Sequence, residues 1–197
     1  IVQPTCDPVN DNLMEILNAI ALTMLKPQMS PLQLMQLYQE AGSATAIVEN
    51  RKHIENVIPE ATPHLKQMLS GLDDALALAE QELKFCEAHS IKALHFGDEN
   101  YPQRLTHCED APLVLYFCGN GNLTPSKVIS IIGTRQCTVY GQDIIRHFIE
   151  DLHETNPDIL VISGLAYGVD IQAHRNALKV GMDTIGVLAH GLDSIYP

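Results

Sequence analysis

The chain has 197 residues, of which 46% are apolar and 18% charged, and its formal net charge is −12 at pH 7. This composition allows a buried core and excludes a disordered chain, and the length suits one mid-sized domain with a small module. Residues 1–96 and residues 97–197 each hold 6 basic and 12 acidic side chains. Neither half therefore has a broad cationic surface for phosphates, and any nucleic-acid site must be local.

No segment is expected to cross or enter a membrane. The apolar stretch 13–25 includes Glu15 and Asn18 and falls short of the roughly 20 residues a bilayer requires. No basic segment precedes it, so no signal peptide is predicted. Five scattered cysteines without a CxxC pair are typical of a cytoplasmic protein. The histidines show no HExxH spacing, so they do not indicate a metal site. We therefore predict a cytoplasmic location, no metal site and no cofactor.

The first part of the chain is predicted to be helical. Apolar residues recur at helical spacing over 13–25, and Ser30-Pro31 predicts the start of a helix that ends at Ala41-Gly42. Ser43 is expected to open a helix through Val48, and a longer helix is expected over 73–89. Pro59 and Pro63 are expected to break the pattern. These segments predict a small all-α bundle.

From Ile91 onward, strands are expected to alternate with helices. Strands are predicted over 91–96, 113–117, 128–132, 159–162 and 184–188, and helices over 141–153 and 169–180. The last three strands are fully apolar and separated by helices, which predicts a parallel sheet covered on both faces. The fold class is therefore α/β.

The loops after these three strands carry the candidate chemistry. They read Gly133-Thr134-Arg135, Ser163-Gly164-Leu165-Ala166-Tyr167-Gly168-Val169-Asp170 and Ala189-His190-Gly191-Leu192-Asp193. In a parallel sheet all three lie at the carboxyl edge, where ligands of α/β proteins bind. Glycines allow close backbone approach, helix N-termini favour anions, and Arg135 suits a phosphate. The loops predict an anion-binding crevice, although each glycine is also compatible with a simple tight turn.

Other residues of these loops have two interpretations. Asp170 and His174 share one helix face, so they suit an acid–base pair, or Asp170 caps the helix while His174 bonds to it or to the neighbouring loop. Tyr140 and Tyr167 suit base stacking or ordinary packing, and His190 suits the crevice or a structural role. Neither G-x-G-x-x-G nor GxxxxGK[ST] occurs, which disfavours dinucleotide binding and P-loop hydrolysis.

A run of motifs over about 95–197 resembles the DNA-processing A (DprA/Smf) family. The matching segments are Tyr101-Pro102-x-x-Leu105, Asp110-Ala111-Pro112-x-x-Leu115-Tyr116-x-x-Gly119, Ile131-Ile132-Gly133-Thr134-Arg135, Tyr140-Gly141, Ser163-Gly164-Leu165-Ala166-x-Gly168-Val169-Asp170-x-x-Ala173-His174 and Thr184-Ile185-x-Val187-Leu188-x-x-Gly191-Leu192-Asp193-x-x-Tyr196-Pro197. The resemblance implies a Rossmann-like domain, here expected over 71–197 and continuing beyond Pro197. It implies a preceding helical module over 1–70 of the sterile-alpha-motif (SAM)-like or helix-hairpin type.

The resemblance also implies a function. Such proteins bind single-stranded DNA, protect incoming DNA and load the RecA recombinase during natural transformation. They act without catalysis, and the full-length protein is expected to be a homodimer. The DNA-binding residues implied are Gly133, Thr134, Arg135, Ser163, Gly164, Ala166, Tyr167 and Gly168, supported by Asp170, His174 and His190. Many members carry a basic residue where this chain has Tyr167. The alternative function is a nucleotide-binding sensor or phosphoribohydrolase-like enzyme that uses the same crevice.

Overall fold

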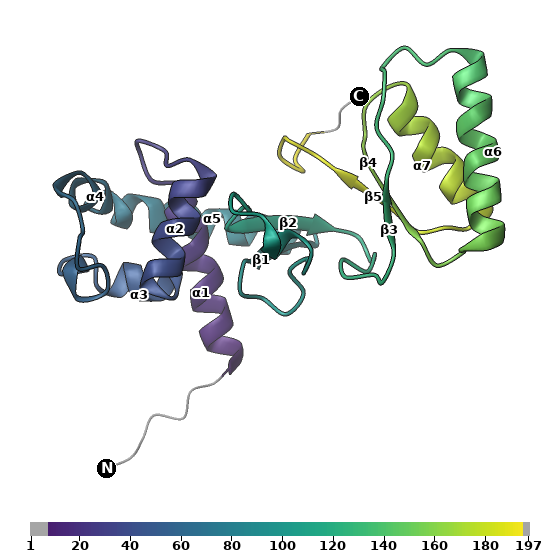
Figure 1. Ribbon diagram of the computed structural model, residues 1–197. Helices are drawn as coiled ribbons and strands as arrows, with labels where there is room; N and C mark the ends of the chain where they lie inside the picture. The colour runs from purple at the N-terminus through teal and green to yellow at the C-terminus, as the bar shows by residue number, and fades with distance from the viewer. Residues whose placement is uncertain (1–7, 195–197) are drawn as a thin grey trace. The chain divides into compact units, whose positions relative to one another are not determined.

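The computed structural model describes residues 8–194, and the chain divides into two compact units (Figure 1). Unit 1 extends to Gly119 and unit 2 begins at Asn120. The boundary near residue 70 that the family resemblance implies stays a prediction. Cys6 and the Tyr196-Pro197 motif lie outside the described residues. Within residues 8–194, no helix combines the length and apolar character needed to cross a membrane.

Unit 1 opens with a group of helices, and the four predicted helices are confirmed. Helix α1 begins at Pro8, earlier than the predicted start at Leu13. The elements are α1 (Pro8–Thr23), α2 (Pro31–Ala41), α3 (Ala44–Glu49), the 3-10 turn η1 (Ile54–Asn56), α4 (Pro63–Leu69) and α5 (Leu72–Ala88).

Helix α4 begins at Pro63, where the sequence predicted only a break. The Thr62 hydroxyl accepts a hydrogen bond from the Leu65 N–H across 3.2 Å, and proline is favourable in the first turn because its missing N–H needs no partner there. The same arrangement, a hydroxyl residue followed by proline at the start of a helix, was predicted correctly at α2. There Ser30 and Gln33 form a reciprocal capping box, with the Ser30 N–H donating to the Gln33 side-chain oxygen across 3.1 Å.

An antiparallel hairpin completes unit 1. Strand β1 (Ile91–His95) pairs with β2 (Val114–Cys118), and the connection between them includes the 3-10 turn η2 (Leu105–His107). Ala111, Leu113 and Val114 belong to the same buried cluster as the helices α1, α2, α3 and α5. The hairpin and the helices therefore share one hydrophobic core.

Unit 2 is built on a three-stranded parallel sheet. Strand β3 (Val128–Ser130) lies beside β4 (Leu160–Gly164), which lies beside β5 (Thr184–Val187). Helix α6 (Val139–Thr155) connects the first pair and α7 (Val169–Val180) connects the second. The three predicted apolar strands and their helical crossovers are confirmed.

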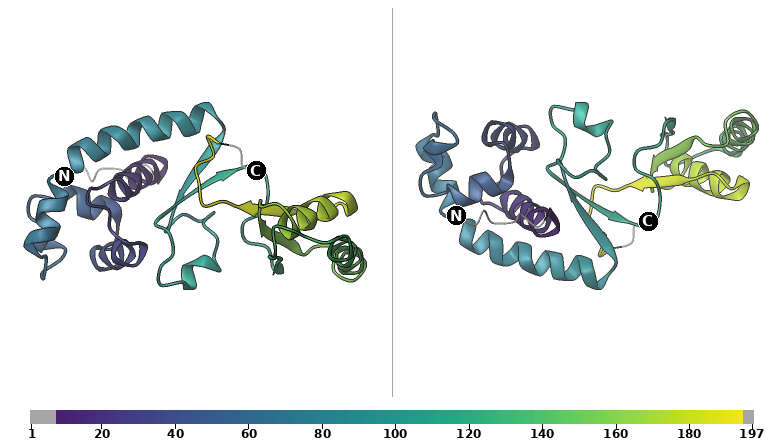
Figure 2. Two further views of the ribbon diagram at one scale, coloured as in Figure 1. Left: turned by 90° about the horizontal axis from the view of Figure 1, so that it is seen from above. Right: turned by 90° about the horizontal axis from the view of Figure 1, so that it is seen from below.

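Helices α6 and α7 pack against each other on one face of this sheet (Figures 1 and 2). Val161 of β4 is fully buried with Ile149 of α6 and with Ala173 and Ala177 of α7. The prediction of helices on both faces is wrong for the described residues. Successive strands are added in one direction, and crossovers of one hand then place every helix on the same side. No reversal of strand order occurs among the described strands.

Candidate functional site

The loops after β3 and β4 are joined to each other. The Val169 N–H donates a hydrogen bond to the Thr134 carbonyl across 3.1 Å. Gly168 has φ +86° and ψ −124°, and a Cβ placed there would lie 2.6 Å from the Arg135 carbonyl oxygen. Only glycine fits that conformation and that approach. We refer to residues 131–138 and 165–168 as the loop pair.

A second glycine, Gly133, also lies at a close contact within the site. A Cβ at Gly133 would lie 2.7 Å from a Val169 methyl carbon, so this loop packs directly on the start of α7. The space beside Gly133 and Gly168 is therefore filled by protein. Close packing of the two loops accounts for both glycines, while their contact with a phosphate stays a prediction.

The exposed side chains of the predicted site within the loop pair are those of Arg135, Thr134 and Tyr167. Arg135 and Thr134 are both exposed, and Tyr167 is 59% exposed. The Thr134 hydroxyl oxygen accepts from the Gln136 N–H across 3.2 Å, which shapes the turn around Arg135. These three side chains are the accessible part of the predicted site.

Ser163, by contrast, faces the interior. It is 3% exposed, and its hydroxyl donates to the Ile131 carbonyl, which ties β4 to the residues that follow β3. Gly164, Ala166 and Gly168 are half-buried. The hydroxyl of Ser163 thus has a structural partner.

Asp170 and His174 are both buried at the start of α7, at 8% and 4% exposure. The His174 Nδ1 lies 2.7 Å from the Thr184 Oγ1 of β5, and that hydroxyl donates to the Val161 carbonyl across 2.9 Å. The Thr184 oxygen therefore accepts from Nδ1–H. Burial lowers the pKa of His174, opposed by the Asp170 carboxylate and the Gly164 carbonyl. His174 thus bonds to Thr184 of β5, and it also interacts with Asp170 and with the Gly164 carbonyl, the partners expected from the sequence.

The N-terminus of α7 is already well complemented by protein groups. The N–H groups of Val169 and Ile171 donate to the carbonyls of Thr134 and Ala166. Asp170 supplies a negative charge in the first turn, which favours the helix dipole. Helix α6 differs, because Thr138 caps it and its first turn has no acidic side chain. An anion is therefore better accommodated at α6 than at α7.

His190 lies after β5, at the carboxyl edge of the same sheet. It is exposed, and its Nδ1 lies 2.9 Å from the Gly191 carbonyl oxygen. Its proposed supporting role stays a prediction. Within residues 8–194, no group of three or more His, Cys, Asp or Glu side chains is placed to hold a metal ion.

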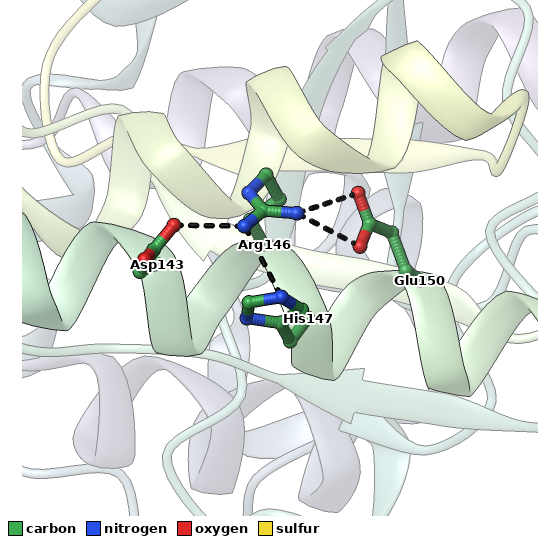
Figure 3. Close-up of polar contacts among 4 residues, drawn as sticks. All are labelled: Asp143, Arg146, His147 and Glu150. Carbon is green, nitrogen blue, oxygen red and sulfur yellow. Dashed lines mark hydrogen bonds and ion pairs between the residues drawn. The ribbon is translucent and has the colours of Figure 1, made fainter.

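Arg146 on α6 is held by its own helix (Figure 3). Its guanidinium lies 2.8 Å from an Asp143 carboxylate oxygen and 3.1 Å from a Glu150 carboxylate oxygen, and it also contacts His147 at 3.1 Å. Both carboxylates raise the pKa of Arg146 further. Spacings of three and four residues on a helix favour this cluster, although it was not predicted from the sequence. Its charge is balanced locally.

A hollow in unit 1 was also missed by the sequence analysis. It has a volume of about 680 Å³ and lies between the end of α1 and one side of α5. Its lining residues are Thr23, Met24, Leu25, Lys26, Gln28, Leu78, Gln81, Glu82 and Phe85. Glu82 also hydrogen-bonds Tyr116, whose pKa is raised mainly by burial. Helical periodicity identifies the buried side of α5 but not a hollow beside it.

The fold and the exposed loops define unit 2 as a Rossmann-like α/β domain with a candidate ligand site at the carboxyl edge of its sheet. Residues 92–197 match the model of the family described as DNA recombination-mediator protein A. The chain belongs to this family, the DprA/Smf family.

Curated relatives bear names consistent with this family. The chain is 31% identical over 135 residues to the DNA processing protein DprA of Streptococcus pneumoniae, covering 66% of this chain and 47% of that protein. It is 33% identical over 108 residues to the DprA of Bacillus subtilis, covering 54% and 36% respectively. It is 30% identical over 151 residues to the protein Smf of Escherichia coli, covering 76% and 40%. The chain thus spans less than half the length of these relatives.

A solved structure supports the fold. The X-ray structure of DprA from Streptococcus pneumoniae superimposes with a TM-score of 0.54 and 23% sequence identity, covering 86% of this chain and 61% of that chain. At this identity the match establishes the fold.

Proposed function

We propose that this chain binds single-stranded DNA at the loop pair of unit 2. The observation that carries the proposal is the exposed Arg135, which lies on one of two loops that hydrogen-bond to each other and precedes the N-terminus of α6, whose first turn has no acidic side chain. A guanidinium in such a position suits one phosphate of a strand. The name of the matching family, which refers to DNA recombination, supports DNA as the ligand.

We further propose that the protein acts in the cytoplasm as a recombination mediator rather than as an enzyme. In this role it protects incoming single strands and transfers them to the RecA recombinase during natural transformation, as a homodimer in its full-length form. The printed names of the family and of its relatives support the mediator role. RecA filament formation on single strands, measured by its ATPase rate with and without this protein, tests the transfer step.

The DNA site is tested by fluorescence anisotropy with labelled oligo-dT at two salt concentrations. Arg135→Ala is expected to weaken binding by about 1–3 kcal/mol, because a hydrogen bond to a charged group is lost. Arg146→Ala is the matched control, since that arginine is already neutralised by Asp143 and Glu150. Equal binding by both variants, or no binding by the unmodified chain, would reject the site. Mononucleotide titrations would then test the nucleotide sensor or hydrolase.

A further inference from the structure

The hollow of unit 1, between the end of α1 and one side of α5, has an apolar lining. Among its lining residues Leu25 is 2% exposed, whereas Leu78 and Phe85 of α5 are 47% and 36% exposed. Leu78 and Phe85 are seven residues apart, so they lie on one face of α5, about 10.5 Å apart along its axis. The Phe85 ring stacks on His89, with the ring centroids 4.0 Å apart. The hollow therefore presents a partly ordered apolar surface to solvent.

Two carboxylates lie on the same side of α5 as these apolar side chains. Glu82 lines the hollow, is partly buried, and hydrogen-bonds Tyr116 of β2. Asp74 is exposed one turn before Leu78, and it lies about 12 Å from Glu82 along the helix axis, at a spacing of eight residues. Lys26 lines the hollow from the segment after α1 and takes part in none of the ion pairs of residues 8–194. The α5 side of the hollow thus combines an apolar centre with negative charge.

The charge of unit 1 indicates the kind of partner that fits this surface. Residues 1–119 hold 7 basic and 16 acidic side chains, and α5 alone has five acidic side chains and one basic. A second copy of this unit is therefore repelled, whereas a segment of opposite charge is attracted. The volume of about 680 Å³ lies within the range of clefts that enclose a ligand. A partner that complements the hollow is accordingly basic around an apolar face.

We propose that the hollow of unit 1 binds a basic amphipathic helix of a partner protein. Apolar side chains of that helix pack on Leu78 and Phe85, because such side chains recur at i, i+3, i+4 and i+7 and so match the seven-residue spacing on α5. Basic side chains eight residues apart on the bound helix reach both Glu82 and Asp74. Lys26 is left to pair with an oxygen of the same helix. This inference does not depend on the DNA site of unit 2.

The test uses the full-length protein and labelled helical peptides in fluorescence anisotropy. The probe is an alanine-rich peptide with leucines at i, i+3 and i+7 on one face and arginines on either side of that face. A second peptide has glutamate in place of each arginine, and a third has the composition of the arginine peptide in scrambled order. The arginine peptide is expected to bind at least about tenfold more tightly than either of the others, because it alone combines the apolar face with positive charge.

Variants of the hollow separate its apolar and charged contacts. Leu78→Ala and Phe85→Ala are each expected to weaken binding of the arginine peptide by at least about fivefold, as apolar anchors of an interface do. Leu32→Ala, at a residue 40% exposed on α2 and outside the hollow, is the matched control. Glu82→Gln is expected to weaken this binding by about 2- to 10-fold and to lessen its salt dependence. Glu87→Gln changes the net charge equally on the same helix, outside the hollow, and is expected to leave binding unchanged.

Leu78→Lys tests what else could cover the hollow. At a half-exposed helix position it is expected to keep the unfolding temperature and the oligomeric state of the full-length protein and to abolish binding of the arginine peptide. A marked fall in unfolding temperature would show that the protein's own chain covers the hollow, and a change in sedimentation would assign it to a contact between copies. Either result would overturn the proposal. So would equal binding of the arginine and scrambled peptides, or no binding of the arginine peptide.

Discussion

The Val169 N–H donates to the Thr134 carbonyl across 3.1 Å, so the first residue of α7 is fastened to the loop that carries Arg135. The position of this arginine therefore depends on two strands and two helices at once. A change on the β4 side is transmitted to the β3 side through this contact.

Gly168→Ala is expected to destabilise the protein strongly. At φ +86° a non-glycine residue costs about 1–2 kcal/mol, and the new Cβ would also lie 2.6 Å from the Arg135 carbonyl oxygen, so the total is expected to exceed about 3 kcal/mol. Gly181→Ala is the matched control, because Gly181 has φ +82° with nothing within 4 Å, and only the conformational cost applies. Urea denaturation measures the loss in free energy of unfolding for both variants. Similar losses in the two variants would contradict the close loop contact.

The free energy of unfolding is expected to decrease as the pH is lowered, because of His174. Its folded-state pKa lies below the ordinary 6.5, so between the two values the unfolded chain binds more protons, and stability decreases as pH falls through 6.5. His174→Gln removes this contribution, so its unfolding free energy should depend less on pH. Urea titrations at pH 7.5, 6.5 and 5.5 compare the slopes, with the remaining histidines common to both proteins. Identical slopes would contradict a neutral, buried His174.

Tyr101→Phe is expected to cost about 1–3 kcal/mol. The Tyr101 side chain is fully buried, and its hydroxyl donates to the Pro112 carbonyl across 2.7 Å. Phenylalanine fills the same volume but leaves that carbonyl without its donor. Burial, with a smaller contribution from Cys108, raises the pKa of Tyr101 to about 12. Tyr140→Phe, at an exposed ring, is the control for unfolding measurements and should stay within about 0.5 kcal/mol.

Glu15→Ala is expected to cost about 2 kcal/mol, because a side chain of α1 caps α3. The Glu15 carboxylate accepts from the Ala44 N–H at 2.7 Å and from the Thr45 N–H at 2.9 Å. The pKa of Tyr38 is raised to about 12, chiefly by burial and secondly by Glu15, so it should fall in this variant. Glu40→Ala, at an exposed site on α2, is the control for both the unfolding and the tyrosine titration.

Local rules predicted most elements and some of their boundaries. The Ser30 cap and the alternation of apolar strands with helices each depend on a few neighbouring residues. The same rule applied to Thr62-Pro63 predicts the start of α4, although a proline considered alone indicates only a break. The capping of α3 by Glu15 joins residues far apart in sequence, and no local pattern encodes it.

The sequence predicted where the loops of the candidate site lie, but not which of their side chains are exposed. Sequence placed the three loops at one edge of the sheet, because parallel strands require it. It did not distinguish the exposed Arg135 and Tyr167 from the buried Ser163, since loop residues alternate in direction without a fixed period. The partner of His174 lies on β5 and depends on the packing of α7. Both helices lie on one face of the sheet because of the strand order, and that order could not be predicted from the sequence.

The hydrophobic core of unit 1 contains residues of both the helices and the β1–β2 hairpin, whereas the family match begins at residue 92, inside β1. The segment matched by the family model therefore does not coincide with a compact unit of the structure. A protein expressed from residue 92 would lack the helices that cover the hairpin, so the buried side chains of Leu94, Leu113 and Val114 would be exposed to solvent. Expression trials of the α/β part alone are better started at Asn120, where the second compact unit begins.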